Sequence, residues 1–264
     1  MNIIVVPTDF SPSADNAMKY AAELAQTVNA SLLLVHVYQI PVSMSDVPVL
    51  MISAEELKVN ADKGLERVRE LLQKNYPRLD IKTDSRLGDV VEEIKTVCAE
   101  ISPLLLVVGK HGASGMERLL FGSTTLSIIR HTAYPLIAVP DAISQFRLNR
   151  AALAADILGI GPQQDFIEQF MSNVNAQLHI IHVHESGKES PGLKNLLPHL
   201  NPVHKTIRNE EFVHGIERYV KSNNIDLLII LPHKHSVIER LFFKTHTTEL
   251  IQKIQIPILC IPEN

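Results

Sequence analysis

The chain has 264 residues, enough for one large or two ordinary domains. Hydrophobic residues make up 45% and charged residues 20% of it, as in globular proteins, and a net charge of −4 argues against a broad nucleic-acid-binding surface. We expect no signal peptide and no membrane span, and two cysteines within apolar segments, Cys98 and Cys260, favour a reducing, cytoplasmic location.

Hydrophobic periodicity predicts strands that alternate with helices. In the first part of the chain, strands are predicted at Ile3–Val6, Ser31–Val37, Leu79–Thr83, Leu104–Val108 and within Pro135–Pro140. Helices are predicted from Pro12 to Asn29, from Ser53 to Lys74, from Asp89 past Cys98, and over Thr124–His131. Ser11 before Pro12, and Ser53 three residues before Glu56, are typical helix starts. Such alternation implies a mainly parallel sheet covered on both faces.

After a looser stretch at 141–149, the pattern begins again. Strands are predicted at Ala151–Ala155, Leu178–Val183, Leu227–Leu231 and Pro257–Ile261, and helices near Phe166–Val174, Glu210–Ser222 and Thr247–Lys253. The polar segment 186–202 is expected to hold at most a short helix around Leu193–Leu197.

The two parts repeat one pattern. Glu117–Phe121 matches Glu239–Phe243 at an offset of 122, whereas Asn29-Ala30 matches Asn175-Ala176 at an offset of 146. The offset falls by 24, so the second copy is shorter, mostly where the first has the long helix after Ser53. A repeat of this length indicates two homologous domains, at 1–142 and 148–264.

A glycine-rich stretch follows the fourth predicted strand. Gly109, Gly112 and Gly122 lead from this strand to the start of a helix. Glycines let backbone amides approach an anion, and a helix N-terminus adds free N–H groups and a positive dipole end. The pattern predicts a phosphate cradle. It is not a Walker P-loop, because Lys110 is in the wrong register.

Together these features resemble the universal stress protein family in its tandem, two-domain form. The family's glycine motif is matched at Gly109, Gly112, Gly122 and Ser123, and the turn Pro7-Thr8-Asp9 and the pair His36-Val37 are also similar. The resemblance covers essentially the whole chain. It implies an α/β fold of two Rossmann-like domains, similar to adenine-nucleotide alpha-hydrolases, each a mainly parallel five-stranded sheet with helices on both faces, the second domain shortened.

The resemblance also implies ATP or AMP as cofactor, with Mg²⁺ as an optional companion, bound at the carboxyl ends of the first domain's strands. Asp9 and Val37 would contact adenine or ribose, and Val108 the nucleoside. The binding residues carried over by position are Pro7, Thr8, Asp9, Val37, Val108, Gly109, Gly112, Gly122, Ser123 and Thr124. No catalytic residue is implied. Slow ATP hydrolysis or self-phosphorylation on Ser123 or Thr124 stays open, as in some family members.

The second copy has lost the motif. Gly109, Gly112 and Gly122 correspond to Leu231, Lys234 and Lys244, so we expect no nucleotide there in the family manner. Nine of the twelve histidines follow Asn149. Those near predicted strand ends are low-ranked metal candidates together with Asp156: His184, His233, His235 and His246. The preferred interpretation is solvated histidines and no metal.

Simpler roles are also open for several residues of the motif. Lys110, His111 and Arg118 are interpreted as exposed loop cations, although they could touch phosphates. The hydroxyl residues Ser123, Thr124 and Thr125 could cap the helix that follows. His36 fits a hydrogen-bonded residue of the core better than a ligand.

Three functions remain. The first is a nucleotide-binding stress sensor or regulator with a regulatory protein partner, no nucleic acid and no membrane. The second is a non-catalytic interaction module, an intramolecular pseudo-dimer that pairs Leu136–Val139 with Ile258–Ile261. In it nucleotide is not required, and a homodimer is open. The third, an ATP pyrophosphatase-like enzyme, ranks last because Pro7–Ser11 lacks a glycine-rich pyrophosphate loop.

Overall fold

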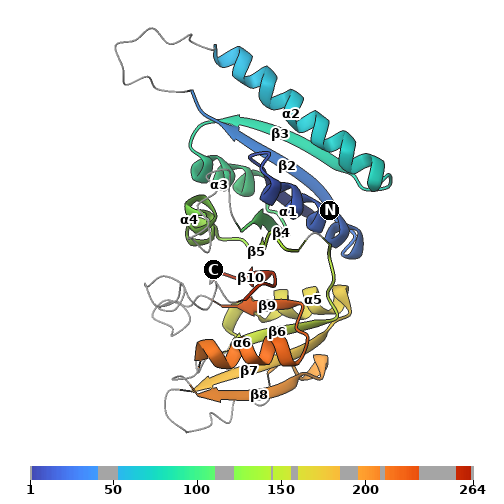
Figure 1. Ribbon diagram of the computed structural model, residues 1–264, viewed down its shortest axis with the longest axis vertical. Coiled ribbons are helices and arrows are strands. Elements are labelled where there is room, and N and C mark those ends of the chain that lie inside the picture. Colours follow the sequence, from blue (N-terminus) through green and yellow to red (C-terminus); the bar gives the residue numbers. More distant parts are fainter. Residues whose placement is uncertain are drawn as a thin grey trace.

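The computed structural model describes residues 2–40, 53–110, 122–143, 145–155, 160–184, 196–208, 212–231 and 254–262. Its first half contains β1 (Ile3–Pro7), α1 (Pro12–Thr27), β2 (Ser31–Tyr38), α2 (Ala54–Asn75), β3 (Ile81–Leu87), α3 (Val90–Ile101), β4 (Leu105–Gly109), α4 (Ser123–His131) and β5 (Leu136–Val139). Its second half contains β6 (Arg150–Ala155), η1 (Gly161–Gln163), α5 (Gln164–Val174), β7 (Gln177–His184), η3 (Pro198–Leu200), β8 (Val203–Arg208), α6 (Phe212–Ser222), β9 (Leu227–Ile230) and β10 (Ile258–Cys260). Figure 1 shows the two halves one above the other.

The ten strands of the described residues form one sheet, in the order β3-β2-β1-β4-β5-β10-β9-β6-β7-β8. The order of the second five strands mirrors that of the first five. Every pairing within a half is parallel, as the alternation of strands and helices predicts. The predicted α/β fold with a mainly parallel sheet is therefore confirmed.

The two halves join through their last strands. β5 and β10 run antiparallel, with Leu259 opposite Ile137 and Cys260 opposite Leu136. All four of these side chains are buried. The junction is thus a continuous sheet with an apolar core on each face, and each half covers a strand edge that would otherwise lie open in the other.

Local sequence signals start the helices of the first half. The Ser11 hydroxyl accepts the Ala14 N–H at the start of α1, where Pro12 occupies the first position. Ser53 and Glu56 form both bonds of a capping box on α2. Asp89 accepts two backbone N–H groups at the start of α3. These caps satisfy donors that a helix leaves unpaired, and they confirm the predicted starts.

The edge strands differ most from the expectations. The predicted strand Leu79–Thr83 lies at Ile81–Leu87, and β8 at Val203–Arg208 was missed. Both strands are polar and largely exposed, because an edge strand has only one neighbour to bury it. In the region expected to hold a short helix, the described residues contain the 3-10 turn Pro198–Leu200. The helix expected at Thr247–Lys253 lies outside the described residues.

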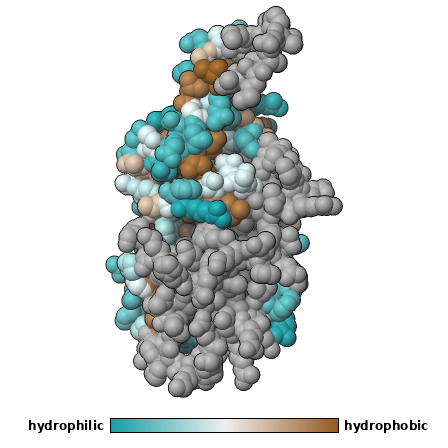
Figure 2. All heavy atoms as spheres, turned by 90° about the vertical axis from the view of Figure 1, so that its left-hand side faces the viewer, coloured by the Kyte–Doolittle hydropathy of each residue, from teal (hydrophilic) through white to brown (hydrophobic). Residues whose placement is uncertain are grey.

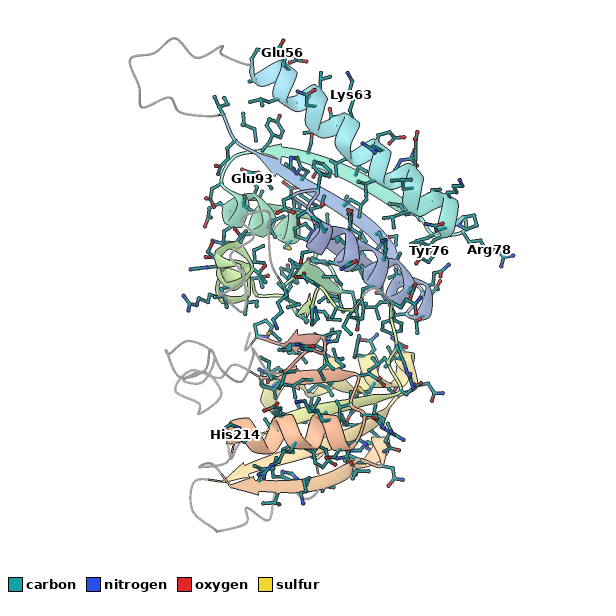
Figure 3. All side chains as sticks on the ribbon, in the orientation of Figure 1. Glu56, Lys63, Tyr76, Arg78, Glu93 and His214 are labelled. Atoms are coloured by element: carbon teal, nitrogen blue, oxygen red, sulfur yellow. The ribbon has the colours of Figure 1, made fainter. Side chains whose placement is uncertain are left out.

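The halves differ in length at one place. The connection between β2 and β3 spans residues 39–80 and contains α2, whereas the one between β7 and β8 spans only residues 185–202. The difference of 24 residues equals the fall in the repeat offset. Figure 3 shows α2 along β2 and β3, with Glu56 at its beginning and Tyr76 just past its end. The Tyr76 hydroxyl donates to Glu23 of α1 at 2.9 Å.

The surface of the first half is mostly hydrophilic on the side that Figure 2 shows, with hydrophobic side chains scattered among polar ones. Among the described residues, the exposed large hydrophobic side chains are Ile40, Val59, Leu71, Leu87 and Val203. No helix in the described ranges has both the length and the apolar character to span a bilayer.

Candidate functional site

A pocket of about 350 Å³ lies at the carboxyl ends of β1, β2 and β4. The chain passes from β1 to β2 on one side and later returns to β4 on the other side of β1. This is the point where strand order reverses, and open α/β sheets bind ligands there. The described residues of the lining are Pro7, Thr8, Asp9, Ala14, Val35, Val37, Val90, Ile94, Val108, Gly109, Gly122, Ser123, Thr124, Thr125 and Ile128.

One wall of the pocket is apolar. Val35 and Val37 from β2, Val108 from β4 and Ile94 from α3 contribute to it. Asp9 is the only charged side chain among the described lining residues. The pocket thus has a slot suited to a flat apolar group, with a carboxylate at its rim.

The N-terminus of α4 forms another wall. Its N-cap is Gly122, and no side chain caps the helix. The expectation that Ser123, Thr124 or Thr125 caps the helix is therefore wrong. Thr125 instead donates its hydroxyl to the Gly109 carbonyl at 3.0 Å, and this bond holds the helix start against the end of β4. The first-turn N–H groups of α4 remain available to an anion.

The two ends of the glycine stretch lie together. The Gly122 N–H donates to the Lys110 carbonyl at 2.9 Å, and the Lys110 N–H donates to Val139 of β5 at 2.8 Å. The end of β4 and the start of α4 therefore lie next to each other, although eleven residues separate Lys110 from Gly122. Gly112, His111 and Arg118 lie outside the described residues.

Gly109 has a packing role that the motif did not reveal. A Cβ at this position would lie 2.6 Å from the Ser13 hydroxyl and 2.8 Å from Ser13 backbone atoms. The first turn of α1 thus sits directly on the end of β4. Gly109 is required because another backbone approaches closely, which is a recurring use of glycine at a strand end.

Lys110 is not the exposed cation that was expected, since only 6% of it is accessible. Its ammonium lies 3.5 Å from the Ile254 carbonyl, in the second half. Burial lowers the pKa of this ammonium, and the charge of Asp141 partly opposes that shift. The lysine of the glycine motif therefore points toward the junction of the halves.

The Asp9 turn is held by its own side chains. The Asp9 carboxylate accepts the Ser11 N–H at 3.0 Å, and the Thr8 hydroxyl accepts the Phe10 N–H at 3.1 Å. His36 Nδ1 donates to the Thr8 carbonyl at 2.7 Å. His36 is thus a hydrogen-bonded residue beside the core, as interpreted from the sequence, and is absent from the described lining of the pocket.

Nine of the ten residues predicted to bind a ligand line this one pocket, and the tenth, Gly112, falls outside the described ranges. Sequence reasoning missed the apolar contributions of Ala14, Val35, Val90, Ile94 and Ile128. A signal existed for the two α3 residues, because Val90 and Ile94 lie on the inward face of a helix that begins at this edge of the sheet.

The second half differs at the corresponding place. Leu231, which aligns with Gly109, is 1% accessible and belongs to the hydrophobic core. Lys234, Lys244, Asp156, His233, His235 and His246 lie outside the described residues, as does the side chain of His184. Within the described part of the chain, no three histidine, cysteine or acidic side chains gather as metal ligands.

Two buried histidines of β7 have side-chain partners instead. His179 Nδ1 lies 2.8 Å from the Tyr219 hydroxyl, and His182 Nε2 lies 2.7 Å from His204 Nδ1. Burial, and then the charge of Arg150, lower the pKa of His179. These contacts are structural pairs between neighbouring elements.

The strand order and the pocket define a doubly wound α/β protein whose site lies at the reversal of strand order. The model of the universal stress protein family matches residues 1–140 and 193–262. The chain belongs to this family. The segment between the two matches contains β6, η1, α5 and β7.

Known proteins similar to this chain are universal stress proteins as well. A universal stress protein of Mycolicibacterium smegmatis is 27% identical over 140 residues, which is 52% of this chain and 47% of that one, so the chain spans about half the length of this relative. One from Methanocaldococcus jannaschii is 26% identical over 52% of this chain and 80% of its own. The crystal structure of a universal stress protein from Archaeoglobus fulgidus covers 100% of this chain and 97% of its own, at 15% identity and a TM-score of 0.71. That likeness shows the fold across both halves.

Proposed function

We propose that the first half binds an adenine nucleotide, ATP or AMP, in the pocket at β1, β2, β4 and α4, and that the protein acts as a stress-response sensor or regulator. The observation that carries the proposal is the uncapped N-terminus of α4, which forms one wall of a pocket with an apolar slot. An unpaired helix start attracts phosphate, and an apolar slot suits a purine ring.

Each part of a nucleotide has a candidate partner. Val37 and Val108 flank the slot for the base and sugar, and Asp9 at the rim suits a ribose or adenine hydrogen bond. Ser123 and Thr124 expose hydroxyls beside the free N–H groups of α4, where phosphate would lie. Gly122 has a φ of −55°, so its value to the site would be the absence of a side chain rather than an unusual backbone conformation.

A regulatory role fits the lining better than rapid turnover. The described lining has one carboxylate, Asp9, and neither a histidine nor a second acid to serve as a general base. A single carboxylate also gives the protein little hold on Mg²⁺, which ATP would bring on its phosphates. Slow hydrolysis, or self-phosphorylation on Ser123 or Thr124, stays within this proposal.

The second half would serve packing or partner contact, and we propose that it binds no nucleotide in the same way. The core side chain of Leu231 occupies the strand end where Gly109 stands in the first half. We also propose the domain limits 1–142 and 148–264, a regulatory protein as partner, and a cytoplasmic location. Two free, buried cysteines, Cys98 and Cys260, suit that compartment.

A second candidate is an interaction module that needs no nucleotide. The antiparallel pairing of β5 and β10 favours it, because this pairing makes a pseudo-dimer within one chain. A homodimer would then have to use other surfaces.

Mass spectrometry of a denatured extract of the purified protein separates the two candidates. Binding predicts that ATP or AMP is released from wild type, and that Gly122→Lys, which copies Lys244, releases none. A wild-type protein that carries no nucleotide and takes up none when ATP or AMP is added would leave the interaction module as the better account.

A further inference from the structure

Phe10 is the unusual residue of the turn that carries Asp9. Its φ is +60°, a left-handed conformation that residues with a Cβ rarely adopt. In the chain, Phe10 stands between Asp9, which lines the pocket, and Ser11, the cap of α1. Such backbone conformations persist where surrounding contacts enforce them, and they cluster at ligand-binding sites.

The contacts that enforce it come from two other elements. The Phe10 ring lies against His36 of β2, with ring centroids 4.4 Å apart. The ring also lies against Gly64 of α2, where a Cβ would stand 2.7 Å from the Phe10 ring. The ring is therefore held between a strand and a helix, and Gly64 provides the space.

The same contacts reach the backbone of the turn. His36, which the ring touches, donates to the Thr8 carbonyl. The Thr8 hydroxyl accepts the Phe10 N–H, and the Asp9 carboxylate accepts the Ser11 N–H. Displacing the ring would loosen a set of bonds that together fix where the Asp9 carboxylate points.

From this arrangement we propose that Phe10, clamped between His36 and Gly64, is a positioning residue that holds Asp9 toward the nucleotide, so that α2 supports the binding site from outside the pocket. The inference rests on the proposed nucleotide site and assigns α2 a role in it. Gly64 belongs to α2, whose 22 residues exceed the whole connection of residues 185–202 between β7 and β8. The helix and the pocket thus occur together, in the same half.

Gly64→Ala tests the clamp without touching the pocket lining. The added methyl must displace the Phe10 ring, while alanine itself favours a helix. We expect the affinities for ATP and AMP, measured by isothermal titration calorimetry, to fall by the same factor of about ten, because Asp9 acts on the nucleoside that both share. Lys63→Ala, an exposed neighbour on α2, is the matched control and should leave both affinities unchanged.

A second variant shows whether the effect passes through the ring. Phe10→Gly removes the ring and suits the positive φ, so the turn is no longer held and a similar loss of affinity is expected. Gly64→Ala added to Phe10→Gly should cause no further loss. If Gly64→Ala does not fold, as judged by circular dichroism, the Phe10→Gly affinities decide.

The outcomes separate the clamp from the proposed function. A wild type that binds neither ATP nor AMP overturns the nucleotide site itself. A wild type that binds, with Gly64→Ala and Phe10→Gly within twofold of it, overturns the clamp alone. A loss confined to ATP would also overturn the clamp, because it would place the effect at the phosphates.

Discussion

The ends of β4 and β9 are the same position of one pattern, built in two ways. In the first half, Gly109 ends the strand and the first turn of α1 sits on it through Ser13. In the second half, Leu231 follows the strand and fills the core with its side chain. A 3-10 turn at Gly161–Gln163 precedes α5, whereas α1 starts regularly at Pro12. A glycine at the strand end lets a helix start close above the sheet, and the pocket forms beside it.

A second contrast concerns what surrounds the site. The first half carries α2 over β2 and β3, and the second half has only residues 185–202 in its place. Both halves nevertheless secure their last strand in a similar way. The Asn16 side chain donates to the Asp141 carbonyl after β5, and the Gln163 side chain donates to the Pro262 carbonyl after β10. The shared bonds support the fold, and the features confined to the first half surround the pocket.

Replacing Gly109 with leucine, the residue at the corresponding position 231, should have the largest effect on stability. Gly109→Leu places a side chain on the Ser13 backbone, and we expect the free energy of unfolding to fall by about 3 kcal/mol or more, with loss of nucleotide binding. Urea denaturation followed by circular dichroism measures it. Leu231→Met, which conserves volume, is the control and should cost less than about 1.5 kcal/mol. Wild-type stability in Gly109→Leu would refute the packing role of Gly109.

A side chain that caps α4 should raise stability and lower nucleotide affinity. Gly122→Asp supplies a carboxylate to the free N–H groups that phosphate would use. We expect the free energy of unfolding to rise by about 0.5–1 kcal/mol, and ATP affinity to fall at least about tenfold. Thermal denaturation and calorimetry give the two values. Unchanged affinity would mean that phosphate does not bind at this helix start.

Removing the hydrogen bond between α4 and β4 should cost less stability than the Gly109→Leu substitution. Thr125→Val removes the hydroxyl that donates to the buried Gly109 carbonyl, and we expect a loss of about 1–2 kcal/mol in the free energy of unfolding. The exposed neighbour Thr124→Val should change it by no more than about 0.5 kcal/mol. Equal effects of the two substitutions in urea denaturation would show that the bond does not secure the helix.

Lys110→Met should raise the free energy of unfolding, the opposite sign to Gly109→Leu and Thr125→Val. Burial lowers the pKa of the Lys110 ammonium, so the folded state binds this proton less tightly than the unfolded state does. At neutral pH the charged form therefore costs stability, and Lys110→Met should raise the free energy of unfolding by about 1 kcal/mol. The advantage should shrink as pH rises toward the ordinary lysine pKa. A variant less stable than wild type at pH 7 would show that the contact near Ile254 outweighs the cost of burial.

The sequence was most informative where a pattern had one physical cause. Buried strands such as Leu105–Gly109 are continuous apolar runs in the sequence. Ser53 and Glu56 predicted the start of α2. Both signals depend only on residues close together in the chain. The edge strand Val203–Arg208 was missed because exposure removes the apolar run on which the prediction depends.

The sequence indicated which residues line the candidate site, but not the contacts that hold them in place. The motif pointed to nine residues that line one pocket. It could not reveal that Gly109 makes room for Ser13, that Lys110 is buried, or that Phe10 is held by Gly64. Each of these depends on contacts between residues distant in sequence, which no spacing rule contains.

Isothermal titration calorimetry of the wild-type protein with ATP tests the central claim most directly. The account predicts a stoichiometry near one nucleotide per chain, since only the first half joins a glycine strand end to an uncapped helix start within the described residues. A stoichiometry near two would contradict the contrast between the halves, and no binding would contradict the nucleotide site.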